Sequence, residues 1–480
     1  MASTQTKSAA VRARLDHPVI DADGHTLEFK PDFLDYLKQV GGAKVHDQFL
    51  AWSDRAGMAR WYRMTWEERR EWRMARPPFW GSPTRNTLDH ATVTLPALQY
   101  ERMGELGLDF SVVYPTMGLT FPHLPDEELR RACSRAHNTH QAEWFRPYAD
   151  RFAPVAVIPM HTPREAIEEL EFAVRELGMK AILMAGHVRR PLPGVMKKAP
   201  EVAHSAFWLD TFGLDSEYDY DPVWARCVEL KVAPTFHSGA MGWGSRTSVT
   251  NYVYNHIGHF AEAGHAVCKS LFLGGVTRRF PTLKFAFLEG GAGWACNLFA
   301  ALVEHWEKRN RASVENFNPA NLDHELMTDL FRRYGRMPEE KIEQLKTALR
   351  KAAERCEDPA MLDEWAKCGI EREEDIRDLF VHNFYFCCEA DDRMNALAFN
   401  AKMNPLGARF KALFSSDIGH WDVPDITGTV EEAYELVEEG LMTEEDFRDF
   451  VFANPVSLLA GTNPEFFKGT AIEKETAQLT

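Results

Sequence analysis

The chain has 480 residues, of which 45% are hydrophobic and 26% are charged, and its formal net charge is −16. This length allows two or three average domains, or one large barrel with insertions, and the composition is that of a globular protein. The acidic balance excludes nucleic acid as the main partner, because phosphate binding needs a basic surface.

Both ends of the chain are polar and are expected to be tails. We expect residues 1–17 to form a disordered N-terminal tail, 18–467 a single domain and 468–480 a C-terminal tail. Residues 1–17 lack the apolar stretch of a secretory signal, and no run approaches 18 uninterrupted apolar side chains, so no membrane association is expected. The 8 cysteines include no C-x-x-C pair, which indicates neither a disulfide framework nor a zinc finger and favours a cytoplasmic location.

Short apolar runs rich in β-branched or aromatic residues recur along the chain, separated by helical patterns. The helical period is clearest over 163–177, where Gly178 is the expected C-terminal cap. Eight strands that alternate with helices predict an α/β protein with a (β/α)8 (TIM) barrel, and no Gly-x-Gly-x-x-Gly motif follows a strand to favour a dinucleotide-binding sheet. The predicted strands cover 18–25, 108–115, 152–159, 180–184, 232–237, 283–289, 383–389 and 412–417.

Two helical stretches exceed what a barrel needs. The first, at about 26–100 after the first strand, is rich in Trp and Arg and leaves the strand at its C-terminal end. It is expected either to cover the active face or to pack its Trp side chains on the barrel. The second, at about 304–380 between the sixth and seventh strands, is highly charged and is expected to support oligomer contacts or the rim.

The first strand ends in an unusual polar pattern. Asp21, Asp23 and His25 alternate along the strand, so their side chains share one face. Such groups are costly to bury unless they are paired or coordinated, and a divalent metal ion offers coordination. The alternative is a solvated loop after a short strand.

Other strand ends carry groups that match this pattern. His237 ends the fifth strand, Glu289 the sixth and Asp417 the eighth, and barrel enzymes place their chemistry at these ends. Read alone, His237 could be a core histidine and Asp417 a turn cap. Together, two carboxylates and two imidazoles can hold one divalent ion and leave room for water or substrate, with Asp21 orienting a ligand. The predicted metal ligands are Asp23, His25, His237 and Asp417.

Glu289 is the strongest candidate for a proton-transferring group. It precedes the glycine-rich segment 290–293, where a ligand can approach the backbone, and a carboxylate beside a metal-bound water can serve as general base and then general acid. The alternative is an acid that interacts with a helix dipole. We expect Glu289 and Asp417 to be catalytic. Further candidates for binding substrate or orienting other groups are His187, His420 and Trp294.

The motifs at these positions resemble the amidohydrolase superfamily, in the branch called amidohydrolase family 2 that is related to aminocarboxymuconate-semialdehyde decarboxylase. The resemblance implies a (β/α)8 barrel with one divalent metal, commonly zinc or manganese, and usually a homodimer. It also implies either hydrolysis of C–N, C–O or C–C bonds or non-oxidative decarboxylation of aromatic and muconate-type acids. The matching segments are 19–25, 236–237, 274–285, 289–294, 416–420 and 454–455.

Two positions depart from the family pattern. The first-strand His-x-His of the family falls on Asp23-Gly24-His25, so a carboxylate stands where an imidazole is commoner. Decarboxylase members carry a catalytic His at the end of strand six, where this chain has Glu289. Because of the second departure, the mechanism of the decarboxylase members cannot be carried over directly to this chain.

The first hypothesis is a metal-dependent hydrolase that activates water for attack on a small, cyclic or aromatic substrate. The alternative is a metal-dependent non-oxidative decarboxylase of an aromatic or muconate-type acid, and a third reading is a metal-binding pseudoenzyme. We expect zinc, with manganese or iron(II) as alternatives, because two oxygens and two nitrogens suit all three. The expected partners are a small-molecule substrate and a second copy of the chain.

Overall fold

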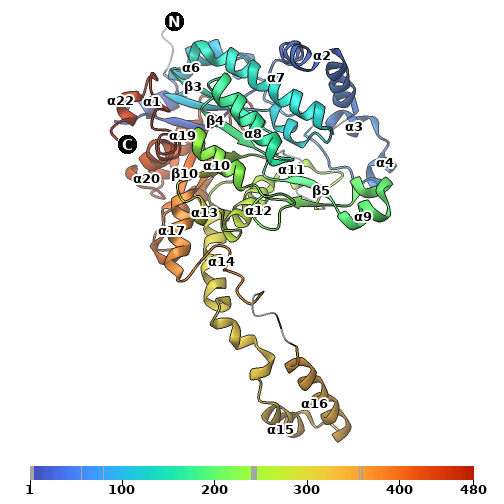
Figure 1. The fold of residues 1–480 in the computed structure, drawn as a ribbon. Coiled ribbons are helices and arrows are strands. Elements are labelled where there is room, and N and C mark those ends of the chain that lie inside the picture. Colours follow the sequence, from blue (N-terminus) through green and yellow to red (C-terminus); the bar gives the residue numbers. More distant parts are fainter. Residues whose placement is uncertain are drawn as a thin grey trace.

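The computed structural model describes residues 5–55, 57–78, 80–238, 246–355, 357 and 361–479. Its main sheet has eight parallel strands in the order β1-β2-β3-β4-β7-β8-β9-β10 and curls into a nearly closed barrel surrounded by helices (Figure 1). The predicted (β/α)8 barrel is confirmed. The barrel strands are β1 (Ile20–Thr26), β2 (Phe110–Pro115), β3 (Phe152–Ile158), β4 (Ala181–Met184), β7 (Pro234–Phe236), β8 (Phe285–Phe287), β9 (Phe384–Glu389) and β10 (Lys411–Ser415).

The helices pack their apolar faces on the outside of the barrel. In α8 (Pro163–Glu171), Thr162 caps the first turn by accepting from the Glu165 N–H, and the chain continues through a π turn to Gly178, whose φ of +71° ends the helix. The predicted helix over 163–177 is therefore found. Other helices beside the barrel are α6 (Pro96–Leu106), α7 (Glu127–Phe145), α10 (Asp221–Leu230), α12 (His259–Leu273), α13 (Val276–Arg279), α17 (Glu373–Asn383), α18 (Ala396–Phe399), α19 (Thr429–Glu438), α20 (Glu444–Arg448) and α21 (Asn454–Leu459).

One pair of strands was not predicted from the sequence. Strands β5 (Val188–Pro191) and β6 (Phe207–Asp210) form an antiparallel hairpin outside the barrel, with the short helix α9 (Pro193–Lys198) in the connection. The segment 188–191 holds two arginines and ends in a proline, so its composition gives no strand signal.

The hydrogen bonds that close the barrel between its first and last strands include two to the carbonyl of Asp23. The Ser415 hydroxyl donates to the Asp23 carbonyl at 3.0 Å, and the Asp417 N–H donates to the same carbonyl at 3.3 Å. The seam of the barrel therefore lies among the predicted site residues.

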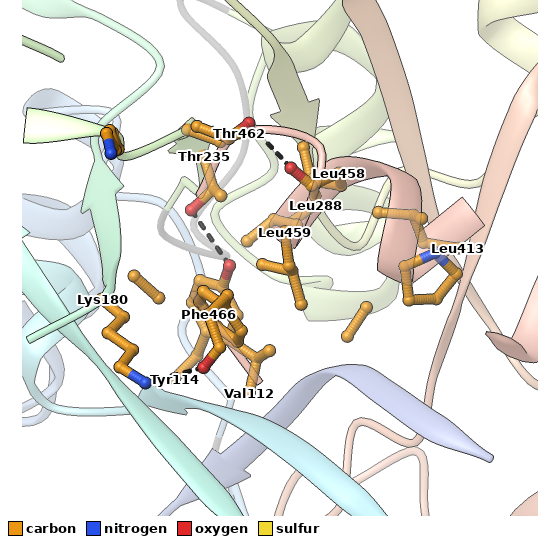
Figure 2. A pocket seen from close by; sticks show the side chains of 15 residues that line it. Val112, Tyr114, Lys180, Thr235, Leu288, Leu413, Leu458, Leu459, Thr462 and Phe466 are labelled. Atoms are coloured by element: carbon orange, nitrogen blue, oxygen red, sulfur yellow. Dashed lines mark hydrogen bonds between the residues drawn. The ribbon is translucent and has the colours of Figure 1, made fainter. Parts of the chain in front are cut away.

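The interior of the barrel is packed rather than open. Figure 2 shows side chains that line a pocket inside the barrel, among them Tyr114, Thr235, Leu458 and Phe466. The Tyr114 hydroxyl lies 3.1 Å from Thr235 Oγ1, and the cavity has a volume of about 20 Å³. A space of this size holds about one water molecule. Substrate must therefore approach from the C-terminal ends of the strands, as in other barrels of this type.

The first insertion reaches the mouth of the barrel. The Arg76 N–H donates to the Ser248 carbonyl at 2.8 Å, and Arg73 Nη2 donates to the Thr247 carbonyl at 2.9 Å, which joins the insertion to the chain after β7. Trp61 is buried, and the guanidinium of Arg69 stacks on its ring at 3.7 Å. A covering role stays a prediction. The helices of this insertion are α2 (Lys30–Arg55), α3 (Gly57–Arg63), α4 (Trp66–Glu71) and α5 (Thr87–Thr92).

The second insertion forms an arm that projects away from the barrel (Figure 1). It consists of the outer end of α14 (Gly293–Arg309) and two further helices, α15 (His324–Gly335) and α16 (Glu339–Ala353). Helix α15 leaves apolar side chains such as Leu326 and Tyr334 exposed. The predicted role in oligomer contacts stays a prediction.

The ends of the described chain differ from the expected tails. Helix α1 (Lys7–Arg12) buries Val11, and Arg12 Nη2 donates to Asp109 Oδ1 at 3.2 Å. At the other end, the Ala471 N–H donates to the Asp150 carbonyl at 2.9 Å, and Ile472 is buried beside the short helix α22 (Glu473–Thr476). Ser8 and His17 are also buried in the first segment and Thr476 in the second, and a mostly polar composition hides such scattered anchors. No described helix has both the length and the apolar character needed to cross a bilayer.

Candidate metal centre

Strand β1 delivers the first two candidate ligands to the mouth of the barrel. Asp23 and His25 are completely buried, and His25 Nε2 lies 3.5 Å from Asp23 Oδ1. His25 Nδ1 donates to the Pro115 carbonyl at 3.2 Å, because a carbonyl can only accept. Nε2 of the neutral ring therefore carries the lone pair and faces the site, as a metal-binding histidine requires.

His237, at the end of β7, is held in the same way. Its Nδ1 donates to the Ser238 carbonyl at 2.9 Å, which leaves Nε2 with the lone pair. The ring packs edge-on against His25, with centroids 5.3 Å apart. Burial lowers the pKa of His237, although the negative charge of Asp23 acts in the opposite direction. Burial also lowers the pKa of His25, so the rings of His25 and His237 both favour the neutral form that binds metals.

Asp417 follows β10 and is joined to two histidines. Its Oδ1 lies 3.5 Å from His25 Nε2 and 2.7 Å from His420 Nδ1. His420 Nε2 in turn lies 3.1 Å from Thr116 Oγ1, and its ring lies tilted against that of His25, with centroids 4.1 Å apart. His420 is therefore in position to orient Asp417, and the orienting role stays a prediction.

Glu289 lies at the end of β8 beside a candidate ligand. Its Oε2 is 2.8 Å from His237 Nε2, and the side chain is buried. Burial, followed by the charges of Asp23 and Asp422, raises the pKa of Glu289 well above its usual range. Burial in this site therefore favours the protonated form of the carboxyl group.

The backbone at the two mouth carboxylates is left-handed. Glu289 has a φ of +55° and Asp417 a φ of +44°. Non-glycine residues adopt this conformation rarely, and such residues cluster at functional sites because the surrounding structure must hold them there. The turn at each strand end aims the carboxylate into the mouth.

The donor atoms fit a divalent cation. Many buried side-chain atoms here make no hydrogen bond to another described residue, and leaving them so would cost several kcal/mol in total. Asp23, His25 and His237 each offer one such atom, and the three lie within 4.8 Å of one another. Asp417 instead groups with His25, Glu289 and His420, so His25 is common to both sets. The atoms without a hydrogen bond are both carboxylate oxygens of Asp23 and Asp417, Nε2 of His25 and His237, and Oε2 of Glu289.

Asp21 lies below the candidate ligands and anchors them. It accepts from the Ser416 N–H at 3.0 Å, the Ser416 hydroxyl at 2.6 Å and the Ser111 hydroxyl at 3.0 Å. A Cβ atom at position 24 would collide with Asp21 Oδ2 and lie 2.6 Å from Ser111 Oγ, which explains why glycine separates Asp23 from His25.

Two predicted residues lie outside this group. His187 packs against His123, with ring centroids 5.1 Å apart, and belongs to neither donor set. Trp294 packs edge-on against Phe287 and Phe386 at 5.7 and 5.3 Å, in the wall between the barrel and the helices. A Cβ atom at Gly290, the residue after Glu289, would lie 2.8 Å from Trp294 Nε1, so a role for Trp294 beside the site stays a prediction.

Three acidic or basic residues near Glu289 were missed. Glu389 ends β9, and burial together with Glu289, Asp422 and further acids raises its pKa to about 9. His256 and Asp422 each place one donor atom within 4.8 Å of Glu289. Glu389 was the last residue of a predicted strand, so its position carried a signal, whereas His256 and Asp422 follow no periodic pattern.

The barrel and its buried donors define a metal-dependent enzyme of the (β/α)8 class. A family model described as Amidohydrolase matches residues 89–316, a little less than half of the chain. The predicted resemblance to amidohydrolase family 2 is confirmed.

Solved structures share this fold at low sequence identity. An amidohydrolase from Mycobacterium avium subsp. paratuberculosis has a TM-score of 0.53 and 17% identity, over 93% of this chain and 100% of that one. A dihydroxybenzoic acid decarboxylase from Polaromonas sp., with bound manganese and the inhibitor 2-nitroresorcinol, has a TM-score of 0.50 and 15% identity over 94% and 99%. A 2,6-dihydroxybenzoate decarboxylase from Rhizobium has a TM-score of 0.50 and 14% identity over 92% and 98%.

Proposed function

We propose that the protein is a metal-dependent enzyme that decarboxylates an aromatic acid without oxidation. The observation that carries this proposal is the buried carboxyl group of Glu289, which lies beside the donor atoms and whose pKa is raised well above its usual range by burial. Decarboxylation leaves an electron pair on carbon and needs a proton donor there, whereas hydrolysis needs a base. Two structures of the same fold are dihydroxybenzoate decarboxylases, which supports this choice over the hydrolase that we favoured from the sequence.

Four residues would hold one divalent ion in this proposal. Two carboxylates and two neutral imidazoles suit manganese or zinc, and the manganese in the Polaromonas enzyme favours manganese. When bound, the ion supplies Lewis acidity that polarises an oxygen substituent of the substrate. The proposed ligands are Asp23, His25, His237 and Asp417.

Glu289 would supply the proton. As the bond between the ring carbon and the carboxylate breaks, its electron pair stays on the ring carbon, and the proton from the Glu289 carboxyl group forms the new C–H bond. The carboxylate leaves as carbon dioxide, and Glu289 regains a proton from solvent. Glu389, half-buried and protonated at neutral pH because its pKa is about 9, is the neighbouring group that can pass this proton on.

Hydrolysis is the second candidate. A bound cation lowers the pKa of nearby carboxyl groups. If Glu289 then ionises, it becomes a general base close to His237, which is the arrangement that favours hydrolysis.

Product analysis separates the two reactions. Manganese-loaded protein is incubated with a panel of hydroxybenzoic acids in D2O, and separately with cyclic amides and esters in water enriched in oxygen-18. We expect carbon dioxide and an aromatic product that carries one deuterium at the vacated ring carbon. Oxygen-18 in an amide or ester product, with no carbon dioxide from any acid, would overturn the decarboxylase proposal in favour of hydrolysis.

A further inference from the structure

A second group of donor atoms lies beside the candidate metal centre. Glu289, His256 and Asp422 each offer one donor atom, and the three atoms lie within 4.8 Å of one another. No residue of this group belongs to the other three-membered donor set, which consists of Asp23, His25 and His237. Each of the two groups can therefore hold a cation while the other is occupied.

Two oxygens of this second group are buried and make no hydrogen bond to another described residue. They are Oε2 of Glu289 and Oδ1 of Asp422, and the Glu289 side chain as a whole is only 2% exposed. Glu289 Oε2 lies 2.8 Å from His237 Nε2, but the lone pair of that nitrogen is used when His237 binds the first ion. Buried oxygens without a donor are costly, and a cation removes this cost.

An aromatic wall holds the other two donors in place. His256 is the last residue of α11 (Tyr252–His256), and its ring packs edge-on against Trp421 and Phe260, with centroids 5.3 and 5.5 Å apart. Asp422 directly follows Trp421 in the chain, so one indole ring positions both the imidazole and the carboxylate. Both residues are half-buried, which distinguishes them from freely moving surface groups.

The second group should bind a cation more weakly than the first site. One imidazole and two carboxylates suit manganese or zinc, as the first set does. However, the second group has only three protein ligands, and two of them are half-buried, so solvent competes for them. An ion in the first site also repels a second positive charge close by.

We propose that His256, Glu289 and Asp422 bind a second divalent cation once the first site is occupied. The site itself goes beyond the proposed function, whereas its effect on the reaction rests on that function. A carboxylate that is bound to a cation carries no proton, so Glu289 would then be unable to protonate the substrate carbon. An excess of the metal that activates the enzyme should therefore inhibit it.

Manganese binding tests the site without turnover. Protein loaded with one manganese ion per chain is titrated with further Mn²⁺, and binding is followed by calorimetry and by electron paramagnetic resonance. We expect one further step in wild type, roughly tenfold or more weaker than the first because of the charge repulsion. Two neighbouring manganese ions couple magnetically, so this step should broaden the resonance of the first ion.

Variants of the two half-buried ligands assign the step to this group. Asp422→Asn and His256→Gln should lose the further step and keep the first ion, which elemental analysis measures. Asp391→Asn, which removes an exposed acid near the mouth, should keep both. Thermal melting confirms that each variant is folded. In an active protein, excess manganese should lower carbon dioxide release roughly tenfold or more in wild type and should not lower it in Asp422→Asn.

The outcomes separate the second site from the decarboxylase. Absence of a further step in wild type would overturn the proposal, and so would a step that persists unchanged in both variants. Loss of the step in both variants of a protein that releases no carbon dioxide would keep the second site and reject the decarboxylase. Carbon dioxide release without a further step would do the reverse. Binding of the second ion with undiminished carbon dioxide release would keep the site and exclude Glu289 as the proton donor.

Discussion

Asp21 and Ser416 join the first and last strands of the barrel, because the Asp21 carboxylate accepts both the backbone N–H and the hydroxyl of Ser416, at 3.0 and 2.6 Å. Asp23 follows Asp21 by two residues, and Asp417 directly follows Ser416. The contact that closes the barrel therefore also sets the distance between two candidate metal ligands. Stability and metal binding should respond together to changes at this seam.

Gly24→Ala tests this coupling. The added Cβ atom would collide with the Asp21 carboxylate, which is held by Ser416 and cannot move freely. We expect a loss of about 2–3 kcal/mol in the free energy of unfolding, together with weaker metal binding. Urea unfolding and metal titration measure the two effects.

Gly104→Ala is the matched control for this substitution. Position 104 lies inside α6, and an added Cβ would meet no atom within 4 Å. The helix should gain roughly 0.5 kcal/mol. A stable Gly24→Ala protein with normal metal affinity would show that the seam and the ligands are independent.

Asp417→Asn should remove the metal and leave the fold intact. Asparagine tolerates the left-handed backbone at this position but offers a neutral ligand, so the metal content should fall from about one ion per chain to a small fraction. Wild type should lose about 2.7 kcal/mol of stability when metal at a hundred times its Kd is removed, and the variant should lose almost none. Elemental analysis and thermal melting check both statements. Asp391→Asn, an exposed acid near the mouth, should behave as wild type.

Glu289→Gln should abolish turnover while metal binding persists. The amide keeps the size of the side chain but cannot give up a proton, so kcat should fall by about 10²- to 10⁴-fold. Steady-state kinetics and metal analysis are the measurements, and Glu304→Gln on the exposed outer part of α14 is the control. Loss of the metal in Glu289→Gln would instead place Glu289 among the ligands.

Glu169 should make the stability of the fold depend on pH. This carboxylate lies between α8 and α7, and burial raises its pKa from 4.5 to about 7, although Arg135 and Asn138 bind it at 2.8 Å. The folded state therefore holds the proton more tightly than the unfolded state, and stability falls as the pH rises from 4.5 to 7. Relative to wild type, Glu169→Gln should gain about 2 kcal/mol between pH 5 and pH 8 in urea unfolding. The half-exposed Glu168→Gln should show no such trend.

The sequence predicted the parts of this molecule that follow a repeated physical pattern. Apolar runs alternating with amphipathic helices sufficed for the barrel, and the rule that chemistry lies at strand ends located His25, His237 and Glu289. Helix α1 and the β5–β6 hairpin were not predicted because a few scattered buried side chains hold otherwise polar segments in place.

The arrangement inside the mouth needed the structure. Asp417 shares its donor set with His25 and His420 and not with Asp23, and this depends on turn geometry that spacing along the chain does not encode. The same holds for Asp422, which reaches Glu289 from a loop.

The left-handed backbone at Glu289 and Asp417 limits how this site can change over evolution. Asparagine, aspartate and glycine enter that conformation at small cost, whereas valine, isoleucine and threonine do not. If the present activity is lost during evolution, we therefore expect an amide side chain or glycine at these two positions. A redesign of the enzyme is limited to the same few replacements.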